Sequence, residues 1–463
     1  MKTKRNLIQL CLLGALLLLL PTEVRAQLTF TTNNGSITIT GYAGNLTVLN
    51  IPSTTNGYPV TSIAANAFLS RLTLTSVTIP DSVTNIGTFA FDQCSGMTNF
   101  TFGGGLTIIG VGAFIQCLGL TSITIPDNVT TIGNQAFLNC HSLTNITFGS
   151  GVTTIGSLAF NDCYGLTSIT IPNNVTNIGT YAFQNCTGLT NIIIGSGVTS
   201  IGQYALDGCT RLVSATIGVP SIGSSLFSSI SMIDGFANLT SITMLDSVTN
   251  IGSYAFVLCQ GLTNITIPQS VTSIGTGVFP ATLVAITVAP NNTSYSSVNG
   301  VLFDASQSTL IQYPQSLGTS NYTVPNSITN IGSGAFEFNF YLTKIYFMSN
   351  APSYGASAFS FVFATVYYLP VTTGWGTTYG GLPTAPWLPQ MQTASINSGG
   401  QTNQFGFNMN WASGQTVVVE ACTNLANPDW QPVQTNMLTT GSAYFSDPQW
   451  TNYPGRFYRL RSP

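Results

Sequence analysis

Charged residues are scarce in this chain. Asp, Glu, Lys and Arg together make up 5% of the 463 residues, and the formal net charge is −3. Proteins that bind nucleic acids carry clusters of basic side chains, so this composition argues against a nucleic-acid partner. With so few charges, the surface must be built mainly from Thr, Ser, Asn and Gly.

The side chains that usually perform catalysis are also few. His141 is the only histidine, and it follows Cys140 at a position that varies between neighbouring segments. A catalytic Cys–His pair needs proximity in the fold, which adjacency in sequence does not provide. We therefore expect His141 to be a surface residue of a loop. We expect a protein that is not an enzyme, without catalytic residues and without a cofactor.

Metal sites are poorly supported as well. The cysteines lack the paired C-x₂-C spacing of structural zinc sites. The scattered aspartates raise the alternative of calcium binding, but Asn often takes the same position. Asp81 and Asp127 each follow a proline that ends a predicted strand, where Asp suits a turn. We predict no metal site.

Long apolar runs are absent after the N-terminus. Lys2, Lys4 and Arg5 precede an apolar stretch at 7–20, and Val24-Arg25-Ala26 resembles a cleavage site. Residues 1–26 are thus predicted to be a secretory signal peptide. The alternative, a membrane anchor, requires a longer apolar run. We expect a secreted or cell-surface protein whose mature chain does not span a membrane.

An internal repeat dominates what remains. Several residue types recur at intervals of 23 residues. The most regular is cysteine: Cys94, Cys117, Cys140, Cys163, Cys186 and Cys209. A period of 20–50 residues is typical of stacked supersecondary units, so we predict a repeat solenoid.

One unit, LTSITIPDNVTTIGNQAFLNCHS, runs from Leu120 to Ser142. Ile123 and Ile125 alternate with polar residues, which predicts a strand with one buried face. Pro126 ends that strand because it has no N–H to donate. A second short extended piece should follow, then a helical or 3₁₀ turn before Cys140. Stacked units should form a parallel β-sheet.

This motif resembles the BspA-type leucine-rich repeat of bacterial surface proteins. The resemblance covers roughly residues 60 to 375. It implies a leucine-rich repeat fold and, as the family theme, adhesion to proteins or surfaces. Two stretches depart from the pattern: residues 213–240 are out of step, with an imperfect unit at Ile222-Gly223, and residues 289–330 form a longer unit.

The regions flanking the repeat define the predicted domains. Residues 27–62, with a hairpin signal at Asn33-Asn34-Gly35, should form an N-terminal β cap. The solenoid is placed at 63–382 and a Pro-rich linker at 383–390. Residues 391–463 should form a small all-β C-terminal domain. All five tryptophans lie after residue 370.

The regular cysteines permit two interpretations. They can form a buried column of small apolar side chains, because free cysteine is among the most buried residues. In an exported protein, stacked coils could also bring their Cα atoms close enough for disulfides. Parallel side chains that point in the same direction make the disulfide geometry poor.

The outward positions of the predicted strands form a regular array of hydroxyls and amides. The candidate ligand face comprises Ser122, Thr124, Asn145, Thr147, Ser168 and Thr170. The array can be a solvated face of β-favouring residues or a surface that binds a ligand. An ice-binding face is a third possibility, although it requires a flat sheet.

We predict a monomeric binding or adhesion protein that contacts a protein or polysaccharide through this rigid solenoid. The alternative is a carbohydrate-binding protein in which the aromatic C-terminal domain contacts the glycan.

Overall fold

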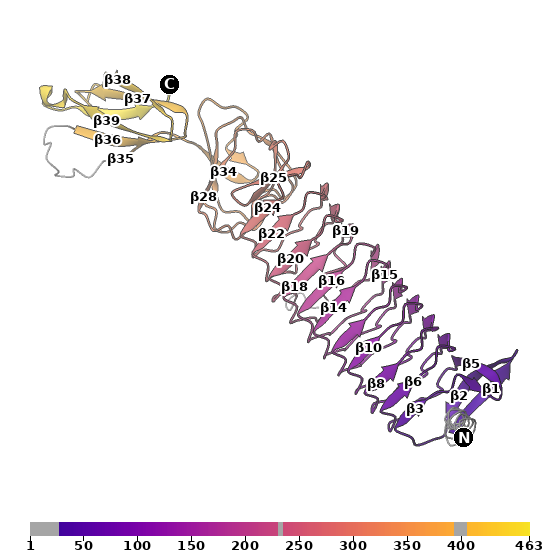
Figure 1. Ribbon diagram of the computed structural model, residues 1–463. Helices are drawn as coiled ribbons and strands as arrows, with labels where there is room; N and C mark the ends of the chain where they lie inside the picture. The colour runs from indigo at the N-terminus through magenta and orange to yellow at the C-terminus, as the bar shows by residue number, and fades with distance from the viewer. Residues whose placement is uncertain (1–26, 230–234, 393–404) are drawn as a thin grey trace, which may run out of the picture. The chain divides into compact units, whose positions relative to one another are not determined.

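The computed structural model describes residues 27–229, 235–392 and 405–463. The predicted signal peptide lies outside these residues. The chain divides into two compact units, 1–300 and 301–463. Both contain parallel strands stacked at a spacing of about 23 residues, which confirms the predicted leucine-rich repeat solenoid (Figure 1).

Each regular coil of the first unit contains a longer strand on one side and a two-residue strand on another. The longer strands are β3 (Val48–Asn50), β6 (Ser76–Thr78), β8 (Asn99–Thr101), β10 (Ser122–Thr124), β12 (Asn145–Thr147), β14 (Ser168–Ile171), β16 (Asn191–Ile194), β18 (Ser214–Ile217), β20 (Ser241–Met244), β22 (Asn264–Ile267) and β24 (Ala285–Val288). Paired neighbours in this series are parallel and in register, so equivalent residues stand side by side.

The short strands form a second parallel series. They are β7 (Asn85–Ile86), β9 (Ile108–Ile109), β11 (Thr131–Ile132), β13 (Thr154–Ile155), β15 (Asn177–Ile178), β17 (Ser200–Ile201), β19 (Ser221–Ile222), β21 (Asn250–Ile251) and β23 (Ser273–Ile274). The series is interrupted once: β17 is the last strand of one sheet and β19 is the first strand of the next.

The N-terminal end of this unit contains the predicted hairpin. Strands β1 (Leu28–Asn33) and β2 (Ser36–Tyr42) pair antiparallel across a turn with Asn34 and Gly35 at φ +48° and +78°. Such values favour an Asn-Gly turn. Strand β2 also pairs with β5 (Tyr58–Ile63), which in turn pairs with β4 (Thr54–Thr55). At the other end of this unit in sequence lies β25 (Tyr295–Val298).

The third side of each coil differs from the predicted helical or 3₁₀ turn. Gln135 and Asn139 adopt φ values of +59° and +61°, which interrupt any helix. Alternate N–H groups then bond to the next coil: Gln135 N donates to Ser157 O at 2.8 Å, and Phe137 N to Ala159 O at 2.8 Å. The N–H groups between them bond three residues back within the same coil, as in Leu138 N to Gln135 O at 3.1 Å, so bonds within the turn alternate with bonds between coils.

Apolar residues fill the interior as continuous columns. The phenylalanines spaced by 23 residues stack face to face; Phe137 lies 5.1 Å from Phe114 and 5.2 Å from Phe160, with nearly parallel rings. Gly133 follows the buried isoleucine because a Cβ there would lie 2.7 Å from the Gly110 carbonyl carbon. The coils approach too closely at this corner for any larger residue.

The second unit repeats the architecture with fewer coils. Its longer strands β28 (Asn321–Val324), β30 (Lys344–Phe347), β32 (Thr365–Tyr368) and β34 (Leu382–Pro386) are parallel, and β33 (Thr378–Tyr379) pairs antiparallel with β34. The other strands are β26 (Val301–Asp304), β27 (Thr309–Gln312), β29 (Asn330–Ile331) and β31 (Ser353–Tyr354). Strand β34 extends the sheet into the segment whose proline content predicts a linker.

The C-terminal part forms two antiparallel three-stranded sheets, which confirms the predicted small all-β domain. One contains β35 (Gln390–Gln392), β36 (Phe405–Asn410) and β39 (Ser442–Asp447). The other contains β37 (Gln415–Cys422), β38 (Gln431–Leu438) and β40 (Phe457–Arg461). A 3₁₀ turn, η1 (Trp450–Asn452), lies between β39 and β40.

Candidate functional site

The six candidate residues lie together on one face of the first unit. We call this set the polar strand face: Ser122 and Thr124 of β10, Asn145 and Thr147 of β12, and Ser168 and Thr170 of β14. All six are exposed, whereas the intervening isoleucines of these strands are buried. This alternation arises because successive side chains of a strand point to opposite faces.

Neighbouring strands align the polar groups in rows. Ser122 is paired with Asn145, and Thr124 with Thr147. Parallel strands are spaced about 4.8 Å apart, so donors and acceptors recur at that interval. Hydroxyl and amide groups both donate and accept hydrogen bonds. The polar strand face is therefore an uncharged, periodic array of groups that can both donate and accept hydrogen bonds.

The described parts of the chain leave these six side chains unused. Within the described residues, none of them takes part in a side-chain hydrogen bond. The threonines immediately before the strands behave differently: Thr144 Oγ1 donates to Thr121 O at 3.0 Å, and Thr190 Oγ1 to Thr167 O at 3.0 Å. Those threonines join the coils, while the polar strand face remains available to a ligand.

The aspartates are engaged in turns. Asp127 Oδ1 accepts hydrogen bonds from the N–H of Ser150 at 2.8 Å and from its hydroxyl at 3.1 Å, and these bonds lower the pKa of Asp127. Asp81 Oδ1 accepts from Gly104 N at 2.7 Å. Over the residues that the structure describes, no group of three or more His, Cys, Asp or Glu is placed to hold a metal ion.

The regular cysteines are buried free thiols, as the column interpretation predicts. Cys140 Sγ donates to Phe114 O, 3.2 Å away on the preceding coil, and burial raises the pKa of this thiol well above its usual range. His141 points elsewhere: it is exposed and stacks on Tyr164 with ring centroids 4.7 Å apart. The two neighbours therefore do not form a nucleophile and its base.

Most of the C-terminal tryptophans take part in packing. Trp411 lies in the core of the antiparallel sheets, and its Nε1 donates to Trp387 O at 2.8 Å. Trp375 packs against the core of the second unit. The Trp430 ring faces the Arg459 guanidinium at 4.5 Å. These three tryptophans are thus held by contacts within the described chain, whereas Trp450 is exposed.

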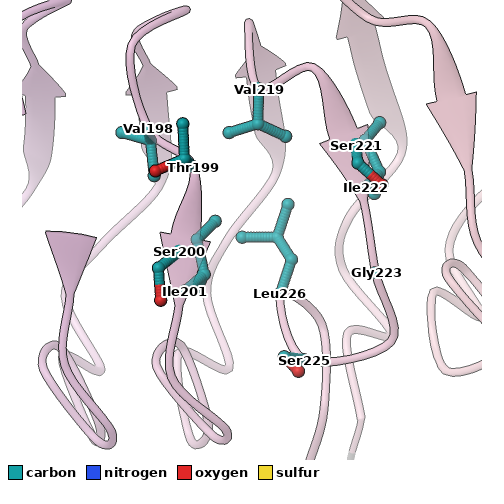
Figure 2. Close-up of a pocket in the computed structure, with 10 residues that line it drawn as sticks. All are labelled: Val198, Thr199, Ser200, Ile201, Val219, Ser221, Ile222, Gly223, Ser225 and Leu226. Carbon is teal, nitrogen blue, oxygen red and sulfur yellow. The ribbon is translucent and has the colours of Figure 1, made fainter. Parts of the chain in front are cut away.

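A cavity of about 300 Å³ lies where the short-strand series is interrupted. Figure 2 shows Ile201 on one side, Ile222 on the other and Leu226 between them. The spacing of the repeats indicates the irregular unit but not the cavity. The signal that could have found it is Pro220, which occupies the position held by Thr199 in the preceding coil.

Comparison with known families agrees with the architecture. The model for the BspA-type leucine-rich repeat region, which contains six repeat copies, matches residues 28–144, 61–187, 107–234 and 234–361. The chain belongs to the BspA-type leucine-rich repeat family. None of the curated proteins matches it.

Solved structures include several leucine-rich repeat proteins similar to this BspA-type chain. A leucine-rich cell surface protein from Faecalibacterium prausnitzii is 28% identical over 71% of each chain, with a TM-score of 0.26. A Bacteroides ovatus protein is 23% identical over 70% of this chain and 93% of its own, with a TM-score of 0.32. The T. pallidum protein is 24% identical over 51% of this chain and 87% of its own, with a TM-score of 0.29.

The described regions of the chain contain no helix with the length and apolar character needed to cross a bilayer.

Proposed function

We propose that this chain is an exported, non-enzymatic binding protein that holds a protein ligand against its polar strand face. The observation that carries the proposal is the set of six exposed hydroxyl and amide side chains that form no hydrogen bond with the described chain. Such groups can bond to a partner without first breaking contacts within the fold.

Rigidity supports the same proposal. The coils are joined by in-register strands and stacked phenylalanines, and by threonine hydroxyls that bond to the preceding coil. A surface held in one conformation loses little conformational entropy when it binds. Membership of the BspA-type family supports a protein-binding or adhesive role. Because function does not follow from fold alone, the specific face is argued from its side chains.

Export is the second part of the proposal. The basic residues and apolar run at 1–26 support cleavage after Ala26 and placement outside the cell or on its surface. The mature chain would then comprise the N-terminal cap, the solenoid and the C-terminal domain. Placement outside the cell would bring the polar strand face into contact with extracellular proteins.

An array of matrix proteins and glycans, probed with the whole chain, tests this function. The companion variant carries Thr124→Lys, Thr147→Lys and Thr170→Lys, which place three long cations on exposed positions. We expect binding to protein spots that the variant loses. Binding confined to glycans, or unchanged by the three lysines, would contradict the proposal.

A further inference from the structure

In the regular coils, the short strands of successive coils are joined by the same backbone hydrogen bonds. Between the coils of β15 and β17, Thr199 N donates to Thr176 O at 2.9 Å, and Gly202 N donates to Ile178 O at 2.8 Å. The same two bonds recur from coil to coil along the preceding part of the series. The carbonyls of Thr199 and Ile201 should therefore receive two N–H groups from the next coil.

The next coil does not supply them. Its equivalent residues, 21 positions later, are Pro220 and Gly223. In the regular coil Thr176 O accepts from the N–H groups of both Thr199 and Ser200, at 2.9 and 3.1 Å. Proline has no N–H, so Pro220 removes the first of these two donors from Thr199 O. Within the described residues, no backbone hydrogen bond joins β17 to β19. Both strands consequently present an unpaired edge to the space between them.

The space around two equivalent glycines, Gly202 and Gly223, shows independently that the coils of β17 and β19 are farther apart than regular coils. A Cβ on Gly202 would lie 2.2 Å from Thr180 N, which is the close contact expected between stacked coils. A Cβ on Gly223 would meet no atom within 4 Å. The regular stacking then resumes, because Gly252 N donates to Ile222 O at 2.7 Å.

The cavity fills this separation. Its walls are the two strand edges, and its lining includes the apolar side chains of Val198, Val219 and Leu226 (Figure 2). These three side chains are buried, whereas Ser200 and Ser221 are exposed at its mouth. The space thus has an apolar floor, polar rims and backbone hydrogen-bonding groups along both sides.

We propose that this gap, the β17–β19 cleft, binds an extended peptide segment of a partner protein by strand insertion. One edge offers the carbonyls of Thr199 and Ile201, and the other offers the N–H groups of Ser221 and Gly223. A strand of a parallel sheet presents alternating N–H and C=O groups to each of its two neighbours, so one inserted strand can bond to the carbonyls of one edge and to the N–H groups of the other. An ion or a sugar cannot match both edges in this way.

The lining also specifies the side chains of the occupant. The short-strand segment of a regular coil has the sequence Val-Thr-Xaa-Ile-Gly, for example Val175 to Gly179, and an additional strand between two coils would stack on segments of this kind. Val175 and Ile178 are buried there, and Thr176 is exposed. A partner segment with the same alternation would place its valine and isoleucine over the apolar floor. Its threonine would face solvent.

Fluorescence anisotropy with a defined probe tests the proposal. The probe is a fluorescein-labelled, amide-capped peptide, NVTNIGT, which copies residues 174–180. We expect saturable binding to the full chain with Kd between about 10 µM and 1 mM. Replacing the peptide glycine with N-methylglycine removes the N–H that would meet Ile201 O. We expect about 10-fold weaker binding for this peptide.

A matched pair of protein variants locates the binding. Gly223→Val places a side chain in open space, so it should fold normally and block insertion. Gly104→Val is the control, because a Cβ there makes only an ordinary contact, 3.6 Å from Asp81 Oδ1. We expect Gly223→Val to abolish binding of NVTNIGT and Gly104→Val to leave its Kd unchanged.

Hydrogen exchange of the unmodified chain gives a readout that does not depend on any variant. The Ser221 and Gly223 amides should exchange at least about 10-fold more slowly when NVTNIGT saturates the protein. Absence of binding at 1 mM peptide, or binding that leaves these amides unprotected, would overturn the proposal. Self-association abolished by Gly223→Val, seen by sedimentation without peptide binding, would overturn it in favour of a second copy as the occupant.

Discussion

The second unit contains a natural substitution in the cysteine column. Asn339 follows Phe336 at the position where the first unit has cysteine, and it is buried. Its Nδ2 donates to Tyr313 O at 3.4 Å and to Phe336 O at 3.0 Å. In the first unit, Cys163 Sγ donates to the carbonyl of the residue 26 positions earlier, the same separation as Asn339 to Tyr313. Asn339 therefore keeps the buried donor of the cysteine position, whereas Val362, at the same position of the following coil, is buried without a side-chain donor.

The magnitude follows from these two bonds. Asn339→Leu has a similar size but removes both donors, and a typical buried hydrogen bond contributes about 0.5–1.5 kcal/mol. We therefore expect Asn339→Leu to lower the free energy of unfolding by about 1–3 kcal/mol. Asn339→Cys retains the donor used in the first unit and should lower it by less than about 1 kcal/mol.

Urea unfolding of the full chain, followed by far-UV circular dichroism, measures the difference. Asn339→Ala serves as the control for lost volume, and the m-value must remain constant if the comparison is to report stability. An apolar column predicts the reverse order, because leucine buries more apolar surface. A leucine variant as stable as the cysteine variant would refute the donor interpretation.

Three further predictions concern other contacts. Phe137→Ala should lower the free energy of unfolding by about 3–5 kcal/mol, and Phe137→Leu by about 1 kcal/mol. If both variants had the urea midpoint of the unmodified chain, the stacked phenylalanines would not stabilise the fold. The six regularly spaced cysteines should react with an aromatic disulfide reagent at pH 8 only after denaturation, because burial raises the pKa of thiols such as Cys140. Rapid labelling of the folded protein would contradict their burial. Hydrogen bonds from Arg461 and Arg459 lower the pKa of Glu420. The ionised Glu420 side chain should therefore contribute its full stabilisation above the ordinary glutamate pKa of about 4.3, and this contribution should be lost as the pH falls through the lowered pKa. In Glu420→Gln, the free energy of unfolding should consequently decrease less steeply at acidic pH than in the unmodified chain.

The repeat made the fold predictable. Because one coil cannot bury its apolar face alone, residues such as Phe137 and Cys140 had to stack on their equivalents. Alternation around Ile123 predicted the longer strand, and Pro126 its end. The turn before Cys140 was the exception. Its left-handed residues are Gln135 and Asn139; asparagine is enriched in that conformation, but glutamine carries no signal for it.

The polar strand face was predictable in position because strand alternation alone separates exposed from buried residues. Its lack of internal hydrogen bonds was not predictable. Thr144 and Thr147 are the same residue type, yet Thr144 bonds to the preceding coil and Thr147 does not. The β17–β19 cleft depends on how far two coils separate around Pro220. The irregular spacing of residues indicates that the stacking changes there. The distance between the two coils depends on side-chain packing, which the spacing does not specify.

The polar strand face is the surface that we propose binds the ligand. An equilibrium titration of an array-identified protein ligand against two triple-lysine variants tests this proposal. One carries Thr124→Lys, Thr147→Lys and Thr170→Lys; the other carries Thr131→Lys, Thr154→Lys and Asn177→Lys on the short strands of the same coils. We predict that the first variant binds about 100-fold more weakly and the second within about 3-fold of the unmodified chain. Equal losses in both variants, or a loss only in the second, would contradict the account.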